Sequence, residues 1–519
     1  LALMLIITIS MNIHLIVRYL QLHRDHPGDD QLALVRATTH KMVRPCLYTA
    51  LTTIIGFSSL VVSDIKPVID FGWMMSAGLA VTFATSFLLF PTLLLLMGKT
   101  ESKPTVDSDR FLLPAYLARL TEFQGNKILA LAVMLSVMGV SGIMLLRVEN
   151  SFINYFSDDT EIYQGLKLID EELGGTTPLE ILIKFEDEDL EELTPEDLKE
   201  MTAEEIEMER EYLEARRNKP ELWFTPDKVR VVKKVHDYLD GLPELGKVLS
   251  LASSVRVAED YADRELDGME LAILYNKAPA TVKKSLIDPF VSIADNEVRL
   301  MARVLDSKPD LRRKTLLETV RRDLGKEHGF EEFDTYKLLI KDVSVSGLLV
   351  LYNNMLQSLF ASQIKTIGVV MLGIAIMFLV LFRSITLSII GILPNLLGAV
   401  VVLGVMGWSK IPMDMMTITI AAITIGIAVD NGIHYIYRFR EEYALTHSYV
   451  ETLHICHSNI GKAVFYTTMT IIFGFSILML SNFIPTIYFG VLTGAAMFIA
   501  LLAALTVLPK LILLWKPFG

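Results

Sequence analysis

Several features of soluble enzymes and of small secreted domains are scarce or missing in this chain of 519 residues. It has two cysteines, Cys46 and Cys456, and both lie outside the long charged block described below, so no disulfide framework holds that block together. It contains no G-x-x-x-x-G-K-[ST] phosphate-binding loop and no H-E-x-x-H zinc motif. We therefore expect neither an ATP-driven pump working on its own chain nor a zincin, and we predict no enzymatic activity, no cofactor and no metal site.

Charged residues are also scarce. They make up 21% of the chain, whereas hydrophobic residues make up 52%; ordinary globular proteins have about 25% and about 45–50%. The net charge of −12 argues against nucleic acid as a partner. Apolar blocks of about 20 residues or more surround one long charge-rich block, a pattern typical of an integral membrane protein with one large water-exposed domain.

Nine apolar blocks are long enough to be membrane spans, because a hydrocarbon core of about 30 Å needs about 20 residues at a rise of 1.5 Å each. The first block starts the chain without an initiator Met, a basic segment or a cleavage site, so we expect a fragment that begins inside a transmembrane helix. The blocks cover roughly residues 1–19, 45–64, 69–98, 127–146, 364–383, 385–408, 413–437, 462–482 and 487–515.

Lys and Arg concentrate in alternate connecting segments. The segments 18–44 and 99–126 and those that follow residues 382, 437 and 509 are basic, whereas the short segments on the other side offer only Lys66 and Lys410. Because basic loops stay in the cytoplasm, this alternation predicts that the 147–362 block lies on the opposite, outer side of the membrane.

The chain contains an internal repeat. A shift of 418 aligns residues 44–93 with 462–511 without a gap, and a shift of 420 aligns the helix before them. Two homologous membrane halves are the usual construction of secondary transporters. The second half consists of one span, an outer domain and five further spans. By comparison, the first half retains only its last three spans, so we expect roughly 290 residues to precede Leu1. Matching residues are Tyr48 with Tyr466, Thr49 with Thr467, Thr52 with Thr470, Gly56 with Gly474, Pro67 with Pro485, Pro91 with Pro509, Ser10 with Asp430, His14 with His434 and Arg18 with Arg438.

The fold class that follows is a polytopic α-helical membrane protein with about nine of an expected twelve spans, a two-half repeat and an inserted α+β extracytoplasmic, porter-like domain. Within this domain we predict strands at 178–187 and 296–306, a strand or the end of one at 247–255, another extended piece at 336–347, helices at 226–240 and 308–325, and two small β-α-β sandwiches. We interpret the acidic stretch 186–212 as a solvated helical insertion rather than a cation site. The predicted segments are 1–98 (three spans), 99–126 (cytoplasmic linker), 127–146 (one span), 147–362 (periplasmic domain) and 363–519 (five spans).

One carboxylate, Asp430, lies well inside a predicted span, roughly 6 Å from its centre near Gly426. An ionised carboxylate there costs at least about 2.5–3.5 kcal/mol, so Asp430 should face the bundle interior or water. His434 and Arg438 follow at i+4 and i+8 on the same helix face. This arrangement predicts a proton path toward the cytoplasm, although a polar anchor between helices is the alternative.

The same reasoning names further residues. Tyr466, Thr467 and Thr470 on the next span are candidate hydroxyl partners of the proton relay, or else ordinary packing residues. The first half has Ser10 where the second has Asp430, so proton handling should be asymmetric. We assign helix packing and coupling to Asn431, Gly432, Gly474, Ser10 and His14.

The run IPMDMMTITIAAITIGIAVDNGIHYIYRFREE and the preceding GILPNLLGAVVVLGVMGW resemble the resistance–nodulation–division (RND) superfamily, in particular its MmpL-like and hopanoid-exporter-like branch. The two T-x₃-GFS segments are similar to the sterol-sensing-type (SSD) core of that superfamily. The resemblance implies twelve spans, two porter-like domains and proton-driven export. It also implies that Asp430 is the acid of the tenth span that takes part in proton coupling, while Ser10 replaces the acid that many members carry in the fourth span.

The expected function is therefore efflux by proton antiport: an exporter of hydrophobic, amphiphilic or lipid-like molecules, driven by the proton-motive force, in the bacterial inner membrane. Protons, membrane lipids and these molecules are the expected partners, and a homo-oligomer or a periplasmic partner stays open. The alternatives are a sterol-sensing-type lipid receptor without transport and a SecDF-like accessory of protein translocation. A receptor would tolerate loss of Asp430, whereas an accessory would cross-link to emerging polypeptide.

Overall fold

The computed structural model describes residues 2–99, 112–146, 151–186, 206–208, 223–308, 310–325, 339–414 and 416–518. The chain forms two compact units, one comprising Leu1–Asn150 and Leu356–Gly519 and the other Ser151–Met355. Most of the predicted acidic insertion at 186–212 lies outside the described residues, and so does most of the segment between residues 99 and 112.

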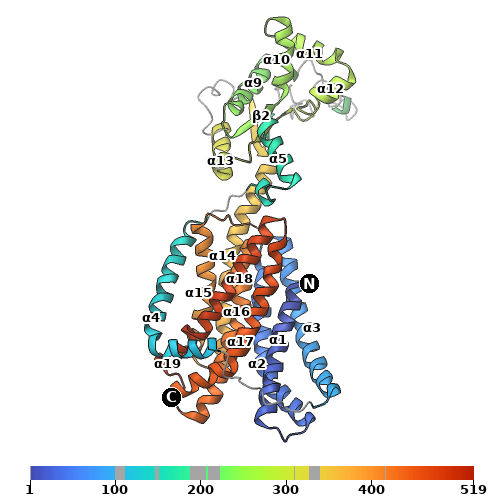
Figure 1. Ribbon diagram of the computed structural model, residues 1–519. Helices are drawn as coiled ribbons and strands as arrows, with labels where there is room; N and C mark the ends of the chain where they lie inside the picture. The colour runs from blue at the N-terminus through green and yellow to red at the C-terminus, as the bar shows by residue number, and fades with distance from the viewer. Residues whose placement is uncertain are drawn as a thin grey trace. The chain divides into compact units, whose positions relative to one another are not determined.

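The first unit is a helical bundle (Figure 1). Among the described residues, nine helical stretches are long and apolar enough to cross a membrane, which confirms the predicted polytopic class. The helices are α1 Ala2–Asp25, α2 Gln31–Ser58, α3 Lys66–Met97, α4 Leu112–Ile143, α14 Leu348–Phe382, α15 Ile385–Trp408, α16 Ile420–Thr446, α17 Tyr449–Ser476, and α18 Ile484–Leu505 with α19 Val507–Trp515, which form the ninth stretch together. Helix α4 begins within the stretch predicted as a linker and is kinked at Gln124.

The repeat reappears in the helix boundaries. Helix α2 spans 31–58 and α17 spans 449–476, so both boundaries differ by 418; the 3₁₀ turns that follow, η1 Ser59–Val62 and η6 Ile477–Leu480, differ by the same number. Helix α3 runs from 66 to 97, and the α18–α19 pair runs from 484 to 515, again a difference of 418. The two halves therefore have helices of the same lengths in the same order, apart from the break in the helix before Val507 in the second half.

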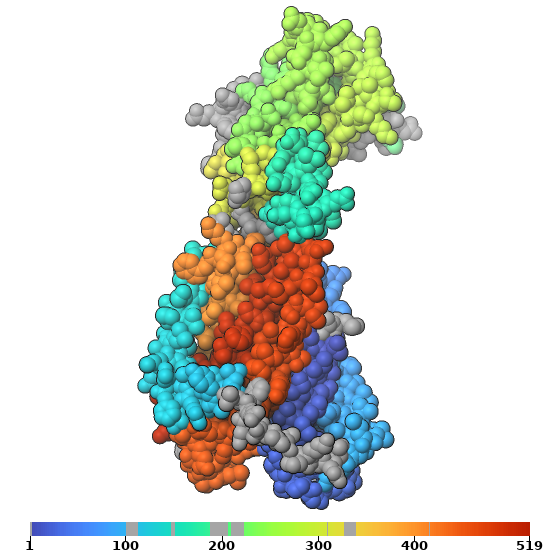
Figure 2. Space-filling view, viewed as in Figure 1, coloured from blue at the N-terminus to red at the C-terminus, as the bar shows by residue number. Residues whose placement is uncertain are grey.

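The two halves interlock through exchanged helix contacts. Helix α16 of the second half packs against α2 of the first, and the equivalent pair, α1 and α17, packs in the same way. Figure 2 shows first-half helices, in blue, directly against carboxyl-terminal helices, in red. Helix α16 also packs against α15, α17 and α18, which explains why nearly all of its residues from Ile420 to Ile436 are buried. A polar side chain on α16 must therefore find its partners inside the bundle.

Small residues permit the closest of these crossings. A Cβ atom added to Gly56 on α2 would lie 2.9 Å from Cα of Gly426 on α16, so the two backbones approach as closely as small residues allow in membrane bundles. The hydroxyl of Thr53 donates to the carbonyl oxygen of Gly426 at 3.2 Å across the same crossing. At the equivalent crossing Gly474 faces the side chain of Ile6. Ile6 is the position that a shift of 420 aligns with Gly426.

The Ser151–Met355 unit is built on one antiparallel sheet. In the part of the chain that the structure describes, the strands follow the order β2-β4-β1-β5, with β3 paired to β4. They are β1 Thr177–Phe185, β2 Leu245–Leu249, β3 Val291–Ser292, β4 Glu297–Val304 and β5 Ile340–Ser346. The helices are α5 Glu161–Glu172, α9 Pro226–Asp240, α10 Leu251–Ala262, α11 Gly268–Lys277, α12 Ala280–Leu286 and α13 Arg313–Leu324. One sheet thus stands in place of the two predicted sandwiches.

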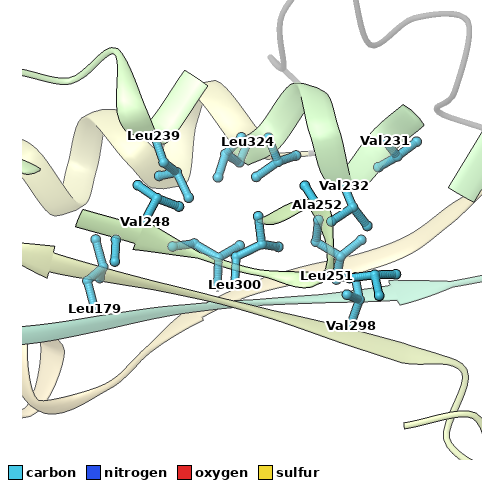
Figure 3. Packing of buried hydrophobic residues seen from close by; sticks show 14 of the residues in the cluster. Leu179, Val231, Val232, Leu239, Val248, Leu251, Ala252, Val298, Leu300 and Leu324 are labelled. Carbon is cyan, nitrogen blue, oxygen red and sulfur yellow. The ribbon is translucent and has the colours of Figure 1, made fainter. Parts of the chain in front are cut away.

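The core of this unit lies between the sheet and its helices. Figure 3 shows Val232 and Leu239 of α9 and Ala252 of α10 over Val298 and Leu300 of β4, and all five are fully or almost fully buried. The predicted strand 247–255 is wrong beyond Leu249. Ser250 caps a helix there by accepting a hydrogen bond from the backbone N–H of Ala252, so α10 begins where we expected the strand to continue.

A buried carboxylate joins the first helix of this unit to the sheet. Asp170 at the end of α5 accepts hydrogen bonds from the backbone N–H and the hydroxyl of Thr176, and from the backbone N–H groups of Asp306 and Ser307, at 2.7–3.0 Å. Burial on its own would raise the pKa of Asp170, but these hydrogen bonds hold the pKa below its ordinary value. Its ionised form therefore stabilises the fold.

Candidate functional site

The most unusual group of side chains in the bundle lies where the two halves meet. Asp430 and His434 stand one turn apart on α16, and His14 faces them from α1. Helical periodicity places residues four apart on one face of α16, and the packing of the two halves brings α1 to that face. The imidazole rings of His14 and His434 are stacked, with their centroids 4.0 Å apart and their planes inclined by 14°.

Each oxygen of the Asp430 carboxylate faces one imidazole. Oδ2 lies 3.7 Å from Nε2 of His14, and Oδ1 lies 3.3 Å from Nε2 of His434. Neither contact is an aligned hydrogen bond: Oδ1 of Asp430 and both ring nitrogens of His14 are buried without a hydrogen-bond partner among the described residues. Buried polar atoms are usually paired with protein or with ordered water, so these atoms require water or an ion.

A cavity of about 30 Å³ lies beside the carboxylate. We call it the core cavity. A single water needs at least about 10–15 Å³ of such space, so this cavity has room for roughly two. Ser10, whose buried hydroxyl has no partner among the described residues, contributes to the wall together with Thr49 and Thr53 of α2. The complete lining is Ile7, Ser10, Met11, His14, Thr49, Ala50, Thr53, Leu79, Ile427, Asp430, His434 and Ile471.

A second cavity, of about 50 Å³, continues toward the α1–α2 connection. We call it the arginine cavity because Arg18 and Arg438 line it together with Glu441. Glu441 lies 3.0 Å from Arg438 and 3.9 Å from Arg18, so the carboxylate bridges two guanidinium groups of opposite halves. The other lining residues are His14, Val17, Gln21, Lys41, Met42, Pro45, His434, Tyr437, Asn459, Ile460 and Ala463.

The arginine cavity lies toward one end of the bundle, and the other end is where the chain passes into the Ser151–Met355 unit. Near that other end, Lys365 of α14 pairs with Asp64, in the α2–α3 connection, at 3.0 Å. The backbone N–H of Asp64 donates to the hydroxyl oxygen of Ser362 on α14 at 3.1 Å. Helix α1 runs from this end past His14 and Arg18 to its connection with α2. The Asp430 cluster therefore lies along a polar line that leads toward the α1–α2 connection.

The cluster has the residue types of a metal site, because His14, Asp430 and His434 each offer a ligand atom, all within 4.8 Å of one another. The ring orientation does not fit a metal. A histidine ligand directs its lone pair within the ring plane, at about 2.0–2.1 Å for zinc. The two imidazole rings are stacked and inclined by only 14°, so their planes meet much farther from the rings than a metal–nitrogen bond reaches. One metal ion therefore cannot lie in both ring planes at bonding distance. One carboxylate oxygen opposite each ring instead fits proton sharing.

The three hydroxyl residues predicted for the relay lie on α17 and form local contacts. Thr467 is buried and donates to the carbonyl of Val464 at 3.0 Å, and Thr470 donates to the carbonyl of Tyr466 at 2.9 Å. The side chain of Tyr466 is 45% exposed, and its ring contacts Phe465. None of the three lines the core cavity. Their equivalents in the first half are closer to Asp430, since Thr49, the match of Thr467, lines that cavity.

The residues assigned to packing and coupling are placed as follows. Asn431 donates to the hydroxyl of Thr468 at 3.1 Å and so joins α16 to α17. Gly432 faces the backbone of Gly391 on α15, where a Cβ would make ordinary contact, and Gly474 faces Ile6. Ser10 and His14 line the core cavity with Asp430. His14 thus lies inside the cluster itself.

Sequence reasoning missed Thr49 and Thr53 as cavity residues. The signal was present in the repeat, because Thr49 aligns with Thr467. Hydropathy does not reveal that the part of α16 around Asp430 packs against α2 of the first half.

The fold and the site together define a polytopic membrane protein of two interlocked helical halves, with an ionisable cluster between them. Residues 341–518 match the model of the MMPL family. This match agrees with the resemblance of the sequence to the RND superfamily.

One curated protein and two solved structures are similar to this chain. A membrane protein of Methanocaldococcus jannaschii is 31% identical over 153 residues, which make up 30% of this chain and 39% of that protein. The hedgehog release protein Disp of the water bear Hypsibius dujardini matches 99% of this chain and 63% of its own, with a TM-score of 0.60 and 12% identity. SecDF, a translocon-associated membrane protein of Thermus thermophilus, matches 99% of this chain and 54% of its own, with a TM-score of 0.52 and 13% identity.

These structural similarities show a shared fold. The chain spans about two fifths of the length of its curated relative. It also spans less than two thirds of the length of each of the two solved structures.

Proposed function

We propose that the protein is an exporter of hydrophobic or amphiphilic molecules driven by the proton-motive force, and that Asp430 carries the coupled proton. One observation carries this proposal: a carboxylate in the middle of a membrane-spanning helix faces two imidazoles and a water-sized cavity. Lys and Arg are absent from the lining of that cavity. The charge on Asp430 therefore has no permanent counter-ion there, and the group can alternate between its ionised and neutral forms.

The energetics favour such an alternation. A charged side chain near the centre of a membrane helix costs about 2.5–3.5 kcal/mol on insertion scales, and protonation of the carboxylate removes that cost. A proton that moves inward through the full membrane potential gains about 2.3 kcal/mol per 100 mV. The two amounts are of the same order, so the membrane potential acts on the charge state of Asp430 with an energy comparable to the cost of the buried charge.

Helix packing provides a route from this change to the rest of the protein. Helix α16 contacts α2 in the first half and α15, α17 and α18 in the second. A change in the charge of Asp430 alters how α16 packs against both halves at once. In our proposal the halves rock against each other as Asp430 gains and loses its proton, which is the usual form of alternating access in transporters built from repeats.

We further propose that the membrane is the bacterial inner membrane, that the Ser151–Met355 unit lies on its outer side and that cargo passes along that unit. The alternation of basic connecting segments supports the orientation. The match of residues 341–518 to the MMPL family supports hydrophobic or amphiphilic molecules as the cargo. A homo-oligomer or an envelope partner is compatible with this proposal.

The test is Asp430→Asn in the native protein reconstituted into vesicles. Asparagine keeps the shape and the hydrogen-bonding ability of the side chain but cannot release a proton. We expect normal folding and the loss of both proton flux, followed with a trapped pH-sensitive dye, and gradient-dependent transport of a fluorescent phospholipid.

Asp414→Asn is the matched control. Asp414 is also buried, but its carboxylate accepts hydrogen bonds from the backbone N–H groups of Met416 and Thr417 at 2.8 Å, ahead of the turn η5 Thr417–Thr419. Asparagine serves equally well in this capping role, so this variant should transport normally. Full proton flux and transport by a well-folded Asp430→Asn protein would refute the proposed role of Asp430 and make the carboxylate a structural anchor between helices.

A further inference from the structure

Among the residues that the structure describes, only His14 and His434 line both cavities. The core cavity contains Asp430, and the arginine cavity contains Arg18, Arg438 and Glu441; the two linings share these two imidazoles and nothing else. The stacked pair therefore forms the partition between the carboxylate and the space that leads toward the α1–α2 connection. A proton that moves between the cavities along the residues they share therefore passes this pair.

The environment of His14 is unfavourable for a residue that only packs. Its side chain is 1% exposed, and neither ring nitrogen has a hydrogen-bond partner among the described residues. A leucine or phenylalanine would fill such a site without leaving polar atoms unpaired. A neutral imidazole has one nitrogen that donates and one that accepts, which is what transfer of a proton across a partition requires.

We propose that His14, from the first half, and His434, from the second, form two parallel proton routes from Asp430 to the arginine cavity. This inference rests on the proposed function. Each carboxylate oxygen faces the Nε2 atom of one ring, at 3.7 Å for His14 and 3.3 Å for His434. The first half thereby contributes a titratable group to proton coupling although Ser10 stands where the second half has its acid.

The proton balance of one transfer is simple. Protonated Asp430 gives its proton to the unprotonated nitrogen of one imidazole, directly or through a water of the core cavity, and becomes a carboxylate. The imidazolium then releases the proton of its other nitrogen to water in the arginine cavity. A ring flip restores the original tautomer. The net result is one proton moved between the two cavities, with no change in the histidine.

The charges around the pair favour release on the far side. In the core cavity the imidazoles face Asp430, which attracts the imidazolium once it is ionised. In the arginine cavity Arg18, Arg438 and Lys41 face Glu441, and Glu442 pairs with Arg438, so the positive charges outnumber the negative ones by one and a positive ring is disfavoured there. Among the described residues, the buried thiol of Cys46 on α2 also lies within electrostatic reach of Asp430. An imidazolium at the partition is thus a transient species.

The experiment compares four variants of the native protein in vesicles with a trapped pH-sensitive dye. They are His14→Gln, His434→Gln, the double glutamine variant, and His14→Phe combined with His434→Gln. Glutamine keeps polar contacts but does not carry a proton between two sites in this pH range. Phenylalanine keeps the stacked ring without its nitrogens and so controls for packing. Expression and thermal stability are matched before the fluxes are compared.

We expect each single glutamine variant to retain part of the proton flux, because the other route stays open. The double variant should lose about 100-fold, the lower end of what loss of a proton-transfer group costs. His14→Phe combined with His434→Gln should match the double variant. The proposal is overturned if the double glutamine variant loses no more proton flux than His434→Gln alone. It is also overturned if His14→Phe combined with His434→Gln keeps the full flux of His434→Gln alone. The proposed function fails separately, through an active Asp430→Asn variant.

Discussion

Replacement of Gly56 by alanine is expected to disturb the crossing at which the first half meets the Asp430 helix. The added Cβ would lie 2.9 Å from Cα of Gly426, 3.7 Å from its backbone nitrogen and 3.8 Å from the carbonyl oxygen of Ala422. Carbon atoms in good contact are about 3.5–4.0 Å apart, so the two helices must separate by about 0.6–1 Å. Overpacking of this kind costs about 1–3 kcal/mol.

The functional loss should exceed the loss of stability. Gly426 lies one turn before Asp430 on α16, and Thr53 donates its hydroxyl to the carbonyl oxygen of Gly426 across this crossing. Separation of the helices lengthens that hydrogen bond and widens the core cavity, which Thr53 lines. Proton flux in vesicles should therefore fall in Gly56→Ala, and the midpoint of thermal unfolding in detergent should fall with it.

The repeat supplies a matched control. Gly474→Ala is the equivalent change in the other half, but the atoms that obstruct it belong to the side chain of Ile6. A side chain can change rotamer at a cost of about 0.5–1.5 kcal/mol, whereas the backbone of Gly426 cannot move out of the way by itself. Ile6→Ala should restore any stability lost in Gly474→Ala, and no side-chain truncation on α16 should restore Gly56→Ala. Equal loss in the two alanine variants, with no rescue by Ile6→Ala, would refute the reasoning.

Two predictions concern the Ser151–Met355 unit. Because the pKa of Asp170 is lowered in the folded state, its stabilising effect is present above the ordinary pKa of an aspartate and is lost as the pH falls through the folded value. At neutral pH, proteolysis should therefore cut this unit more slowly in the wild-type protein than in Asp170→Asn. The difference between the two proteins should shrink below about pH 4. An unchanged difference at acid pH would contradict this. In a variant without its two natural cysteines, a cysteine at Asp240 should react with an impermeant thiol reagent from outside the cell membrane, and one at Asp29 in the α1–α2 connection should not. The reverse labelling would overturn the proposed orientation.

The sequence by itself determined the elements of this protein. Apolar length predicted nine spans, and the spacing of 418 predicted helix boundaries that repeat with the same interval, 31–58 against 449–476. It also singled out Asp430, because one carboxylate inside an apolar run is conspicuous in composition alone. These features depend on properties of single segments, namely the cost of charge in hydrocarbon and the length of a helix that crosses it.

In the Ser151–Met355 unit, local sequence patterns predicted some elements correctly and others incorrectly. Alternating burial identified β1 and β4 because both are strands with one face in the core. The stretch KVLSLASSV was misassigned after Leu249, since a single capping serine converts an apolar run from strand to helix. The number of sheets was not readable at all, because strand pairing depends on contacts between segments far apart in the chain.

Only the tertiary structure decided what Asp430 faces. The sequence pointed to Tyr466, Thr467 and Thr470 on the following helix, but Thr49, Thr53 and His14 of the first half line the cavity beside the carboxylate. Every helix of a membrane bundle is apolar on most sides, so hydropathy does not distinguish one neighbour from another. The choice depends instead on where small residues let two backbones approach, as Gly56 and Gly426 do, and that fit exists only once both halves are folded together.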